Sequence, residues 1–443
     1  MRSCSPFALV LVASLVASSS ACGDDDGAGP TPDAGPRSDA RTDDDAMASD
    51  AMPAIDGASP PPPPIDMGLP IDPALVGPED ITYVGSFDVP RDDRVGGEQG
   101  VFAYGGHALG FDPDADALFL GGHDWYQLLG EIAIPDSLSG TAEVLQDLAD
   151  PTDGMGNRID DSTLKLGGVL VDGDRLIFTV YSYYDADSTQ TLSHFASSRD
   201  LSVSDDVVGP FAMTGGANAR SVAGYMGWIP PEWRSTLGGS ALTGNCCLSI
   251  LGASSAGPSA TVFEPADVGT RDPIPGTTVL FYPLGNETTR DGTTTNDIFV
   301  QSDQVAGIAF PPGTRSVLFI GRHGRGEYCY GPGTDDVSLH GMPDGEGNVW
   351  CHDPSDSSKG THAFPYVHYV WAYDANDFVE VREGRREPWD VVPYATFTLD
   401  GIDDGGTARI AGATFDPDTG RLFLTERYGE EPRVHVLRIA VGE

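Results

Sequence analysis

Tryptophan, tyrosine and arginine residues gather in a few short segments of this chain. Their aromatic faces can stack on the CH faces of sugar rings, while charged side chains bond to sugar hydroxyls. The same rings could instead pack their segments onto the rest of the protein, and the sequence leaves both interpretations open. The side chains that we predict to bind a polar ligand of this kind are Trp125, Tyr126, Tyr183, Tyr184, Tyr225, Trp228, Trp233, Arg322, Arg325, Tyr328 and Arg427.

Carboxylates near these aromatic residues suggest a second chemistry. Cleavage of a glycosidic bond needs two carboxyl groups about 5 to 9.5 Å apart across the bond. Glu327 and Glu426 are the first candidates for this catalytic role, and Asp185 is the third. Spacing along the chain does not give the distance between them, so binding without catalysis remains the alternative.

Cysteine usage is consistent with an exported protein. Two of the six cysteines, Cys4 and Cys22, lie in the N-terminal segment, which leaves an even number in the rest of the chain. We predict a disulfide between Cys329 and Cys351. The remaining two, Cys246 and Cys247, are adjacent and would form either a vicinal disulfide or two separate thiols.

Short alternating apolar runs between Gly, Asp and Pro turns fill residues 79–443, with no long helical periodicity. Three segments share one frame of strand, tight turn and strand, at 109–123, 307–323 and 412–427. Two weaker copies, at 167–181 and 238–252, fit the same frame. The pattern predicts an all-β domain with five repeated hairpins.

A third apolar run follows every hairpin, and a fourth follows every hairpin except the last. The segment ITYVGSFDV at 81–89 is free to supply that missing outer strand. Four-stranded units that close in a ring leave no free sheet edge. Residues 79–443 therefore resemble a five-bladed β-propeller. Six or seven blades are the alternative, because about 73 residues per unit is long against the usual ~40 to 50.

The resemblance implies that the loops after the second strands share one face, where sites on this fold usually lie. The loop at 324–367 is much longer than the others, and a Cys329–Cys351 disulfide would hold both its flanks. We expect this loop to cover a ligand site. A second insertion, RSVAGYMGWIPPEWRST, is expected to bring Tyr225, Trp228 and Trp233 towards the same side. Several five-bladed propeller families are carbohydrate-active enzymes, so the resemblance also implies a glycoside hydrolase or lyase as an alternative to a binding protein.

Histidines recur at one position of the repeat. His123 and His323 end the second strands of two units, while Tyr181 and Arg427 occupy the same position in two others. Together with His107 and His194, these histidines would form a cluster at the channel mouth able to hold a transition metal. The alternative is that they are hydrogen-bonding residues at strand ends.

A calcium loop is the other metal motif to weigh. Asp112, Asp114 and Asp116 form a D-x-D-x-D run, but the required Gly and the final Glu are absent. Asp416 and Asp418 occupy the same turn of another repeat. We interpret the run as a β-turn.

The first residues indicate export. Arg2, an apolar run from Phe7 to Ala17 and small residues before Cys22 resemble a bacterial lipoprotein signal, although Ser19 stands where Leu or Val is usual. This predicts a signal peptide at 1–21, a lipidated Cys22 and a disordered Asp-, Ala- and Pro-rich tether at 22–78. The predicted location is the outer membrane, facing the periplasm or the cell surface, with simple secretion as the alternative.

Charge excludes one class of partner. The formal net charge is −42, and Lys165 and Lys359 are the only lysines. Such a field repels phosphate backbones, so we predict no nucleic-acid partner. The predicted partners are the lipid bilayer, through Cys22, and a polysaccharide or oligosaccharide. The overall hypothesis is a tethered protein that binds carbohydrate, with a carbohydrate-active enzyme and a His-ligated metal enzyme as alternatives.

Overall fold

The computed structural model describes residues 73–160, 163–248, 253–284, 298–403, 405–426, 429–430 and 432–440. The chain divides into two units, Met1–Asp66 and Met67–Glu443, and all described residues belong to the second. The predicted signal peptide, Cys22, most of the predicted tether and Arg427 lie outside the described residues.

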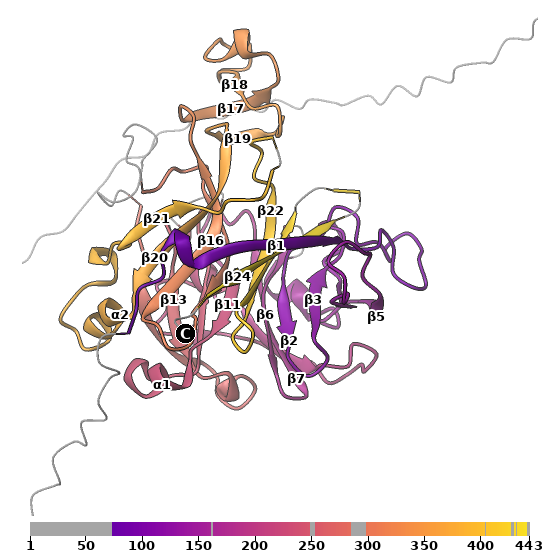
Figure 1. Ribbon diagram of the computed structural model, residues 1–443, viewed down its shortest axis with the longest axis vertical. Coiled ribbons are helices and arrows are strands. Elements are labelled where there is room, and N and C mark those ends of the chain that lie inside the picture. The colour runs from indigo at the N-terminus through magenta and orange to yellow at the C-terminus, as the bar shows by residue number, and fades with distance from the viewer. Residues whose placement is uncertain are drawn as a thin grey trace, which may run out of the picture. The chain divides into compact units, whose positions relative to one another are not determined.

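Five antiparallel sheets account for most of the strands, and they are numbered here in chain order (Figure 1). Sheet 1 consists of β2 (Gly110–Asp112), β3 (Ala117–Gly121), β4 (Leu129–Ala133) and β5 (Val144–Ala149). Sheet 2 consists of β6 (Leu164–Asp172), β7 (Arg175–Ser182), β8 (His194–Ser198) and β9 (Val208–Phe211). Sheet 3 consists of β11 (Tyr225–Trp228), β12 (Ala241–Gly244), β13 (Ala260–Phe263) and β14 (Ile274–Leu280), with β10 (Met213–Thr214) added in parallel to β14.

Sheet 4 consists of β15 (Gln304–Ala309), β16 (Ser316–Gly324), β20 (Tyr366–Asp374) and β21 (Ala395–Thr398). Sheet 5 consists of β22 (Ile410–Asp416), β23 (Arg421–Glu426), β24 (Arg433–Ile439) and β1 (Ile81–Asp88). A small sixth sheet consists of β17 (Cys329–Thr334), β18 (Cys351–His352) and β19 (Lys359–His362). The prediction of a mainly β domain built from four-stranded antiparallel units is confirmed.

Helices are few and short. Among the described residues, the α-helices are α1 (Pro231–Leu237) and α2 (Ala375–Arg382). Single 3₁₀ turns are η1 (Pro78–Asp80), η2 (Met155–Arg158), η3 (Arg220–Val222), η5 (Pro265–Asp267), η6 (Val337–Leu339) and η7 (Pro388–Asp390). Within the described ranges, no helix combines the length and the apolar character needed to cross a bilayer.

Four of the five predicted hairpins are present, as the antiparallel pairs β2–β3, β6–β7, β15–β16 and β22–β23. The aspartates at their turns act as predicted. Asp112 Oδ1 accepts hydrogen bonds from the amides of Asp114 and Ala115, and Asp416 Oδ1 accepts from the amides of Asp418 and Thr419. The D-x-D-x-D run is therefore a turn that closes a hairpin.

The fifth predicted hairpin, at 238–252, is wrong. Sheet 3 begins instead with β11, and α1 separates β11 from its partner β12. Pro231 occupies the first turn of α1, where a missing N–H costs nothing, and Gly238, at φ 82°, ends the helix. The described part of this segment, 238–248, thus supplies a second strand, and Cys246 and Cys247 follow the end of that strand rather than lying in a hairpin turn.

The outer strand of sheet 5 comes from the other end of the domain. β1 pairs antiparallel with β24, from Ile81 opposite Ile439 to Asp88 opposite Arg433. The run at 81–89 therefore has the partner that the repeat pattern predicts for it.

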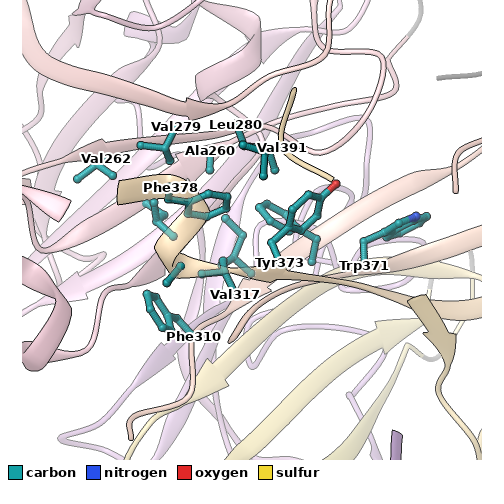
Figure 2. Close-up of a cluster of buried hydrophobic side chains, with 14 of the residues drawn as sticks. Ala260, Val262, Val279, Leu280, Phe310, Val317, Trp371, Tyr373, Phe378 and Val391 are labelled. Atoms are coloured by element: carbon teal, nitrogen blue, oxygen red, sulfur yellow. The ribbon is translucent and has the colours of Figure 1, made fainter. Parts of the chain in front are cut away.

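The core lies between successive sheets. In β3, Leu118 and Leu120 face the residues Phe423 and Val436 of sheet 5, while Phe119 faces sheet 2. Similar apolar clusters join sheets 2 and 3, 3 and 4, and 4 and 5. Figure 2 shows the cluster between sheets 3 and 4, whose members include Val262, Leu280, Val317, Trp371 and Phe378. Both faces of each sheet are therefore covered.

The first strands of the five sheets contact one another in the order β2, β6, β11, β15, β22, and β22 also contacts β2. Their close approach requires residues without side chains. A Cβ atom at Gly307 of β15 would lie 2.2 Å from the carbonyl oxygen of Ala413 in β22. Glycine at this position lets the two strands approach.

The packed chain begins before the predicted boundary at Glu79. Val76 is 2% exposed. Its amide donates to Ser316 Oγ at 2.8 Å, and its carbonyl accepts from Tyr394 Oη at 2.8 Å. The last residues assigned to the tether therefore pack on sheet 4.

Candidate functional site

A cavity of about 130 Å³ opens between the beginnings of the inner strands β6, β11, β15 and β22. We call it the central cavity. It combines ionisable, amide and aromatic side chains with the small residues of the strands. Its principal side chains are Tyr104, His107, Asp124, Lys165, Tyr181, Tyr183, Asn245, Cys246, Cys247 and Gln304.

An ion pair lies at this cavity. Lys165 Nζ is 2.6 Å from Asp124 Oδ2 and also donates to the Asp124 carbonyl at 2.9 Å. Gln127, buried in the same turn, accepts the amide hydrogen of Leu166 at 2.6 Å and so fixes the turn against β6. The pair presents one positive and one negative group to the cavity, a combination that suits hydroxyl-rich ligands.

Asn245 offers a hydrogen-bond donor without a partner. Its backbone is fixed by Ser259, whose Oγ accepts from the Asn245 amide at 2.9 Å and donates to its carbonyl at 2.7 Å. The side chain is 4% exposed, and no group among the described residues accepts from its Nδ2. A buried donor of this kind normally has a partner, and the cavity is where a ligand could supply one.

The two cysteines after Asn245 also line the cavity and form a vicinal disulfide. Cys247 adopts φ 60°, and its amide donates to the Ser255 carbonyl at 3.0 Å. The disulfide thus presents two polarisable sulfur atoms beside the Asn245 amide. The alternative of two separate thiols is not what the structure contains.

Exposed aromatic side chains surround this polar cavity. Tyr104 and Tyr183 line it and are exposed, and Tyr184 is exposed on the same loop as Tyr183. Trp125, next to Asp124, is 82% exposed. We call these four residues the aromatic rim. Large apolar side chains left in solvent near a cavity are typical of a contact surface.

His123 and Arg220 hold the rim in place. The ring of His123 lies 5.3 to 5.4 Å from those of Tyr104, Trp125 and Tyr126, and its Nδ1 accepts from the Trp125 amide at 3.2 Å. Arg220, which is fully buried, donates to the carbonyl oxygens of Ser182 and Tyr183. Burial of this guanidinium lowers its pKa.

Of three further predicted aromatic residues, one lies at the central cavity and two lie elsewhere. Tyr225 lines the cavity but is buried, and its hydroxyl exchanges hydrogen bonds with the Ser259 backbone. Trp233 is 1% exposed in α1 and donates to the Thr314 carbonyl at 2.8 Å. Trp228, at the end of β11, lines a different cavity. This corrects the expectation that Trp228 and Trp233 lie on the loop face, and the cause is the misassigned hairpin of sheet 3.

The predicted catalytic carboxylates are not brought together at the central cavity. Asp185 is buried and accepts the amide hydrogens of Thr189 and Gln190, which shapes the loop after β7. Glu426 Oε1 is 2.8 Å from His435 Nε2, and this hydrogen bond lowers the pKa of Glu426. Glu327 is exposed. Among the described residues that line the cavity, Asp124 is the one carboxylate.

The remaining predicted ligand residues lie around sheet 4. Arg322 stacks on Tyr366, with 4.2 Å from its Cζ to the ring centroid. Tyr328 donates to Gln301 Oε1 at 2.9 Å, and Arg325 is exposed. None of the three lines the central cavity.

The long insertion after β16 is a folded element rather than an open loop. It contains the small sheet of β17, β18 and β19, and Figure 1 shows that this sheet stands apart from the others. The predicted disulfide Cys329–Cys351 joins β17 to β18. No residue between 324 and 367 lines the central cavity, so the expected cover over a site is not seen there.

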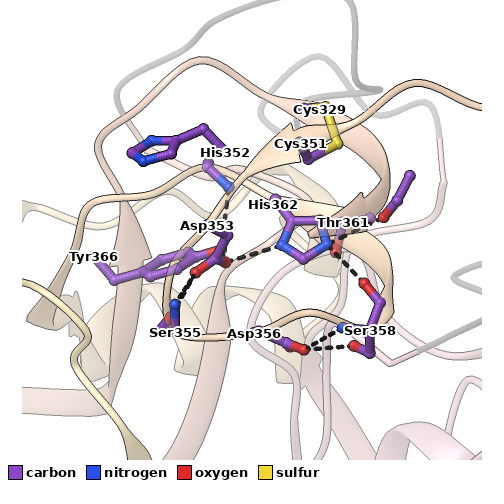
Figure 3. Close-up of polar contacts among 12 residues, drawn as sticks. Cys329, Cys351, His352, Asp353, Ser355, Asp356, Ser358, Thr361, His362 and Tyr366 are labelled. Atoms are coloured by element: carbon purple, nitrogen blue, oxygen red, sulfur yellow. Dashed lines mark hydrogen bonds and ion pairs between the residues drawn. A yellow bond between two sulfur atoms is a disulfide. The ribbon is translucent and has the colours of Figure 1, made fainter. Parts of the chain in front are cut away.

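A buried histidine–aspartate pair lies beneath that disulfide (Figure 3). His362 Nδ1 is 2.9 Å from Asp353 Oδ2, which also accepts from Tyr366 Oη at 2.8 Å. His362 Nε2 faces the carbonyl oxygens of Gly331 and Ser358 at 3.2 and 3.1 Å. Among the described residues no hydroxyl bonds to Nε2, so the pair lacks the geometry of a catalytic triad, and its hydrogen bonds link parts of the insertion.

The four histidines proposed as metal ligands occupy separate environments. His107 lines the central cavity, and His123 lies within the aromatic cluster. His194 is fully buried against Phe263, and burial lowers its pKa to about 3. His323 Nδ1 is 3.0 Å from Asp303 Oδ2. Within the described ranges, no three His, Cys, Asp or Glu side chains gather to hold a transition metal or calcium.

Residue type and local composition predicted some of the residues at the cavity and missed others. Tyr183 and Tyr225, which we predicted as ligand contacts, line the cavity, whereas Trp125 follows Asp124 in the chain without lining it. Lys165, Asn245 and Gln304 were not predicted. Lys165 had one signal, since it is one of only two lysines in the chain.

Comparison with known proteins leaves the family open. No known protein family and no curated protein matches the chain. Among solved structures, the chain is similar to an α-L-arabinanase mutant of Cellvibrio cellulosa, at 9% identity and a TM-score of 0.39, over 76% of this chain and 92% of that one. It is also similar to a glycosyl hydrolase from Bacteroides ovatus, at 10% identity and a TM-score of 0.38, over 83% of this chain and 95% of that one.

An exo-1,5-α-L-arabinanase from a bovine ruminal metagenomic library gives 8% identity and a TM-score of 0.38, over 75% of this chain and 93% of that one. A luciferin-regenerating enzyme, with a different activity, gives 7% identity and a TM-score of 0.34, over 81% of this chain and 94% of that one. Likenesses this weak carry no argument about function.

Proposed function

We propose that this chain is an exported, lipid-anchored β-propeller of five blades that binds a carbohydrate in the central cavity. The blade assignment is supported by the five sheets, by the contact of β22 with β2, and by the pairing of β1 with β24. Export is supported by the signal-like first residues and by two disulfides.

One observation carries the ligand class: exposed aromatic side chains surround a polar cavity. The rim offers flat apolar faces, and Trp125 has almost no packing role because most of it is in solvent. The cavity offers the Lys165–Asp124 pair and the Asn245 amide as hydrogen-bonding groups. Sugar rings present this same alternation of CH faces and hydroxyls.

Binding is favoured over cleavage. Glycoside hydrolysis in its usual form uses two carboxylates that flank the bond. The described cavity offers Asp124 alone, and that carboxylate is paired with Lys165. None of Glu327, Glu426 and Asp185 lines the central cavity. A hydrolase or lyase that used them would therefore need an active site outside this cavity.

Retention on immobilised polysaccharides and a glycan array, with the purified full chain, tests the proposal. We expect saturable binding of at least one neutral or acidic glycan, and a loss of about tenfold in the Trp125→Ala and Tyr183→Ala variants. Trp389→Ala is the matched control, because Trp389 is exposed and, unlike Trp125, has no sequence neighbour that lines the cavity. Absence of binding across the array, or equal loss in the control, would overturn the proposal.

The anchor has a separate test. Metabolic labelling with radioactive palmitate in a bacterial host should label the wild-type chain and leave the Cys22→Ser variant unlabelled. Equal labelling of both would sink the lipid anchor without affecting the carbohydrate site.

A further inference from the structure

A second, larger cavity lies at the opposite ends of the same inner strands. In β6, residues 165–168 line the central cavity and residues 169–172 line the second one. The same division holds for β11, β15 and β22. The second cavity has a volume of about 530 Å³, which falls within the usual range for small-molecule sites.

Its wall is apolar and rich in aromatic rings. Phe111, Trp228, Phe310 and Phe415 line it, and all but Phe310 are only partly buried. Prolines occupy the turns around them, at Pro113, Pro230, Pro231, Pro312 and Pro417. Proline fixes the backbone angle φ and removes the N–H donor, so these turns make a stiff edge with few hydrogen-bond donors.

The charged groups at this cavity are mostly acidic. Asp172, Glu264 and Asp418 line it, and none of them forms an ion pair with any described residue. Glu264 Oε1 accepts only from Ser240 Oγ, at 2.8 Å. Three carboxylates therefore line one apolar cavity, and two of them, Glu264 and Asp418, are exposed.

The arginines nearby are already engaged. Arg234, the one cation that lines the cavity, donates from Nε to the Ile229 carbonyl at 2.8 Å, and its Cζ lies 6.0 Å from the centroid of the Trp228 ring. Arg421 pairs with Asp116 and Asp416, and Arg199 pairs with Asp112 and Asp114. The lining thus carries three carboxylates against one guanidinium, so its net charge is negative.

We propose that the second cavity binds a small organic cation with an apolar body, such as a quaternary ammonium or a substituted amine. Its apolar part contacts the rings of Phe111, Trp228 and Phe415, and its positive charge lies between the ring faces and the three carboxylates. Aromatic faces attract cations through the ring quadrupole, and the strongly acidic chain adds a long-range attraction.

Isothermal titration of the full chain with benzyltrimethylammonium tests the charge requirement, with benzyl alcohol and phenylacetate as the neutral and anionic probes. We expect the cation to bind at least tenfold more tightly than the alcohol, the anion not to bind, and the affinity for the cation to fall with added salt. Equal affinity for the three probes, or no saturable binding of the cation at millimolar concentration, would overturn the proposal.

A charge-neutralised variant locates the site. Asp172→Asn, Glu264→Gln and Asp418→Asn combined should weaken cation binding about tenfold and leave the binding of benzyl alcohol unchanged. The control carries the same change in net charge at exposed positions away from the cavity: Asp136→Asn, Glu143→Gln and Asp390→Asn. Equal weakening in the control would mean that the overall field, and not this cavity, attracts the cation.

Two further variants separate this cavity from the aromatic rim. Trp228→Ala should weaken binding of the cation, whereas Trp125→Ala should leave it unchanged. If Trp125→Ala abolished binding, the cation would occupy the rim and the assignment to the second cavity would be wrong. Should Trp228→Ala fail to fold, the charge-neutralised variant still decides the question.

Discussion

Lys165 Nζ lies 2.6 Å from Asp124 Oδ2, where the start of β6 meets the turn after β3. Both side chains are mostly buried, and the pair lines the central cavity. Removing one partner leaves the other charge poorly solvated.

We therefore expect Lys165→Gln to lower glycan affinity about tenfold and to destabilise the fold by about 1 to 3 kcal/mol, because the Asp124 carboxylate loses its partner. Calorimetric binding and urea unfolding measure the two effects. Lys359→Gln replaces the other lysine, which is exposed on β19, and should change neither. An unchanged glycan affinity in Lys165→Gln would show that the Lys165–Asp124 ion pair does not take part in binding.

Two tryptophans test the division between rim and core. Trp233→Ala should lower the free energy of unfolding by about 3 to 5 kcal/mol, because it removes a buried ring and its hydrogen bond to Thr314. Trp125→Ala should change it by less than about 0.5 kcal/mol, because that ring is in solvent. Chemical unfolding monitored by circular dichroism gives both values. A large loss of stability in Trp125→Ala would show that this ring packs on the protein.

The ionisation of His362 should make the stability of the insertion, and not of the five sheets, depend on pH. Burial opposes a charge on this ring, but the hydrogen bond and charge of Asp353 outweigh it and raise the pKa of His362 above 6.5. The contribution of the protonated His362–Asp353 pair to the stability of the insertion is thus fully present below pH 6.5. It is lost as pH rises through the pKa of His362 in the folded state. Burial likewise opposes a charge on Asp353, but hydrogen bonds from His362, Ser355 and Tyr366 prevail and lower its pKa, so this contribution is lost only in strong acid.

Hydrogen exchange measures this effect. Protection of the Gly333 and Asp353 amides, which bond within the insertion, should fall between pH 6 and pH 9 after correction for the intrinsic exchange rate. The His362→Gln variant should lose the dependence. A constant protection factor in the wild-type chain would contradict the prediction.

Glycine at the inner strands should be irreplaceable. Gly307→Ala places a Cβ atom 2.2 Å from the Ala413 carbonyl, so β15 and β22 must separate, at a cost of about 2 kcal/mol or more. Gly360→Ala is the control, because nothing lies within 4 Å of its Cβ position. Thermal unfolding should distinguish the two variants clearly. Equal melting temperatures of Gly307→Ala and Gly360→Ala would mean that β15 and β22 can move apart without loss of stability.

The cysteines can be tested by mass spectrometry of the non-reduced chain. We expect no alkylation at Cys246, Cys247, Cys329 or Cys351, because all four are in disulfides. Reduction before alkylation should label each of them. Two alkylated thiols at Cys246 and Cys247 without reduction would rule out the vicinal disulfide.

Local signals made most of the strands predictable. The Asp-Pro turns at Asp112 and Asp416 separate alternating apolar runs, and both runs on either side of each turn are strands. The prediction for sheet 3 was wrong because α1 lies between its first two strands, β11 and β12. A strand as short as Tyr225–Trp228, followed by two prolines, has no alternation long enough to distinguish it from a loop.

The site was less predictable because its polar members depend on distant neighbours. Asn245 is oriented by Ser259, and Lys165 by Asp124, so neither role has a local pattern. Trp125 and Tyr183 were predicted from the aromatic residues that gather in their loops, and both side chains are exposed in the structure. Loops rich in aromatic residues can be recognised in a sequence. Polar side chains that are oriented by a residue far away in the chain cannot.

The β1–β24 ladder has a consequence for how the molecule is made. Among the described strands, β1 is the first to be synthesised and its partner β24 is the last. Until β24 is made, β1 is an open edge able to pair with another chain. Contacts of such long sequence separation form slowly, so sheet 5 is completed late in folding.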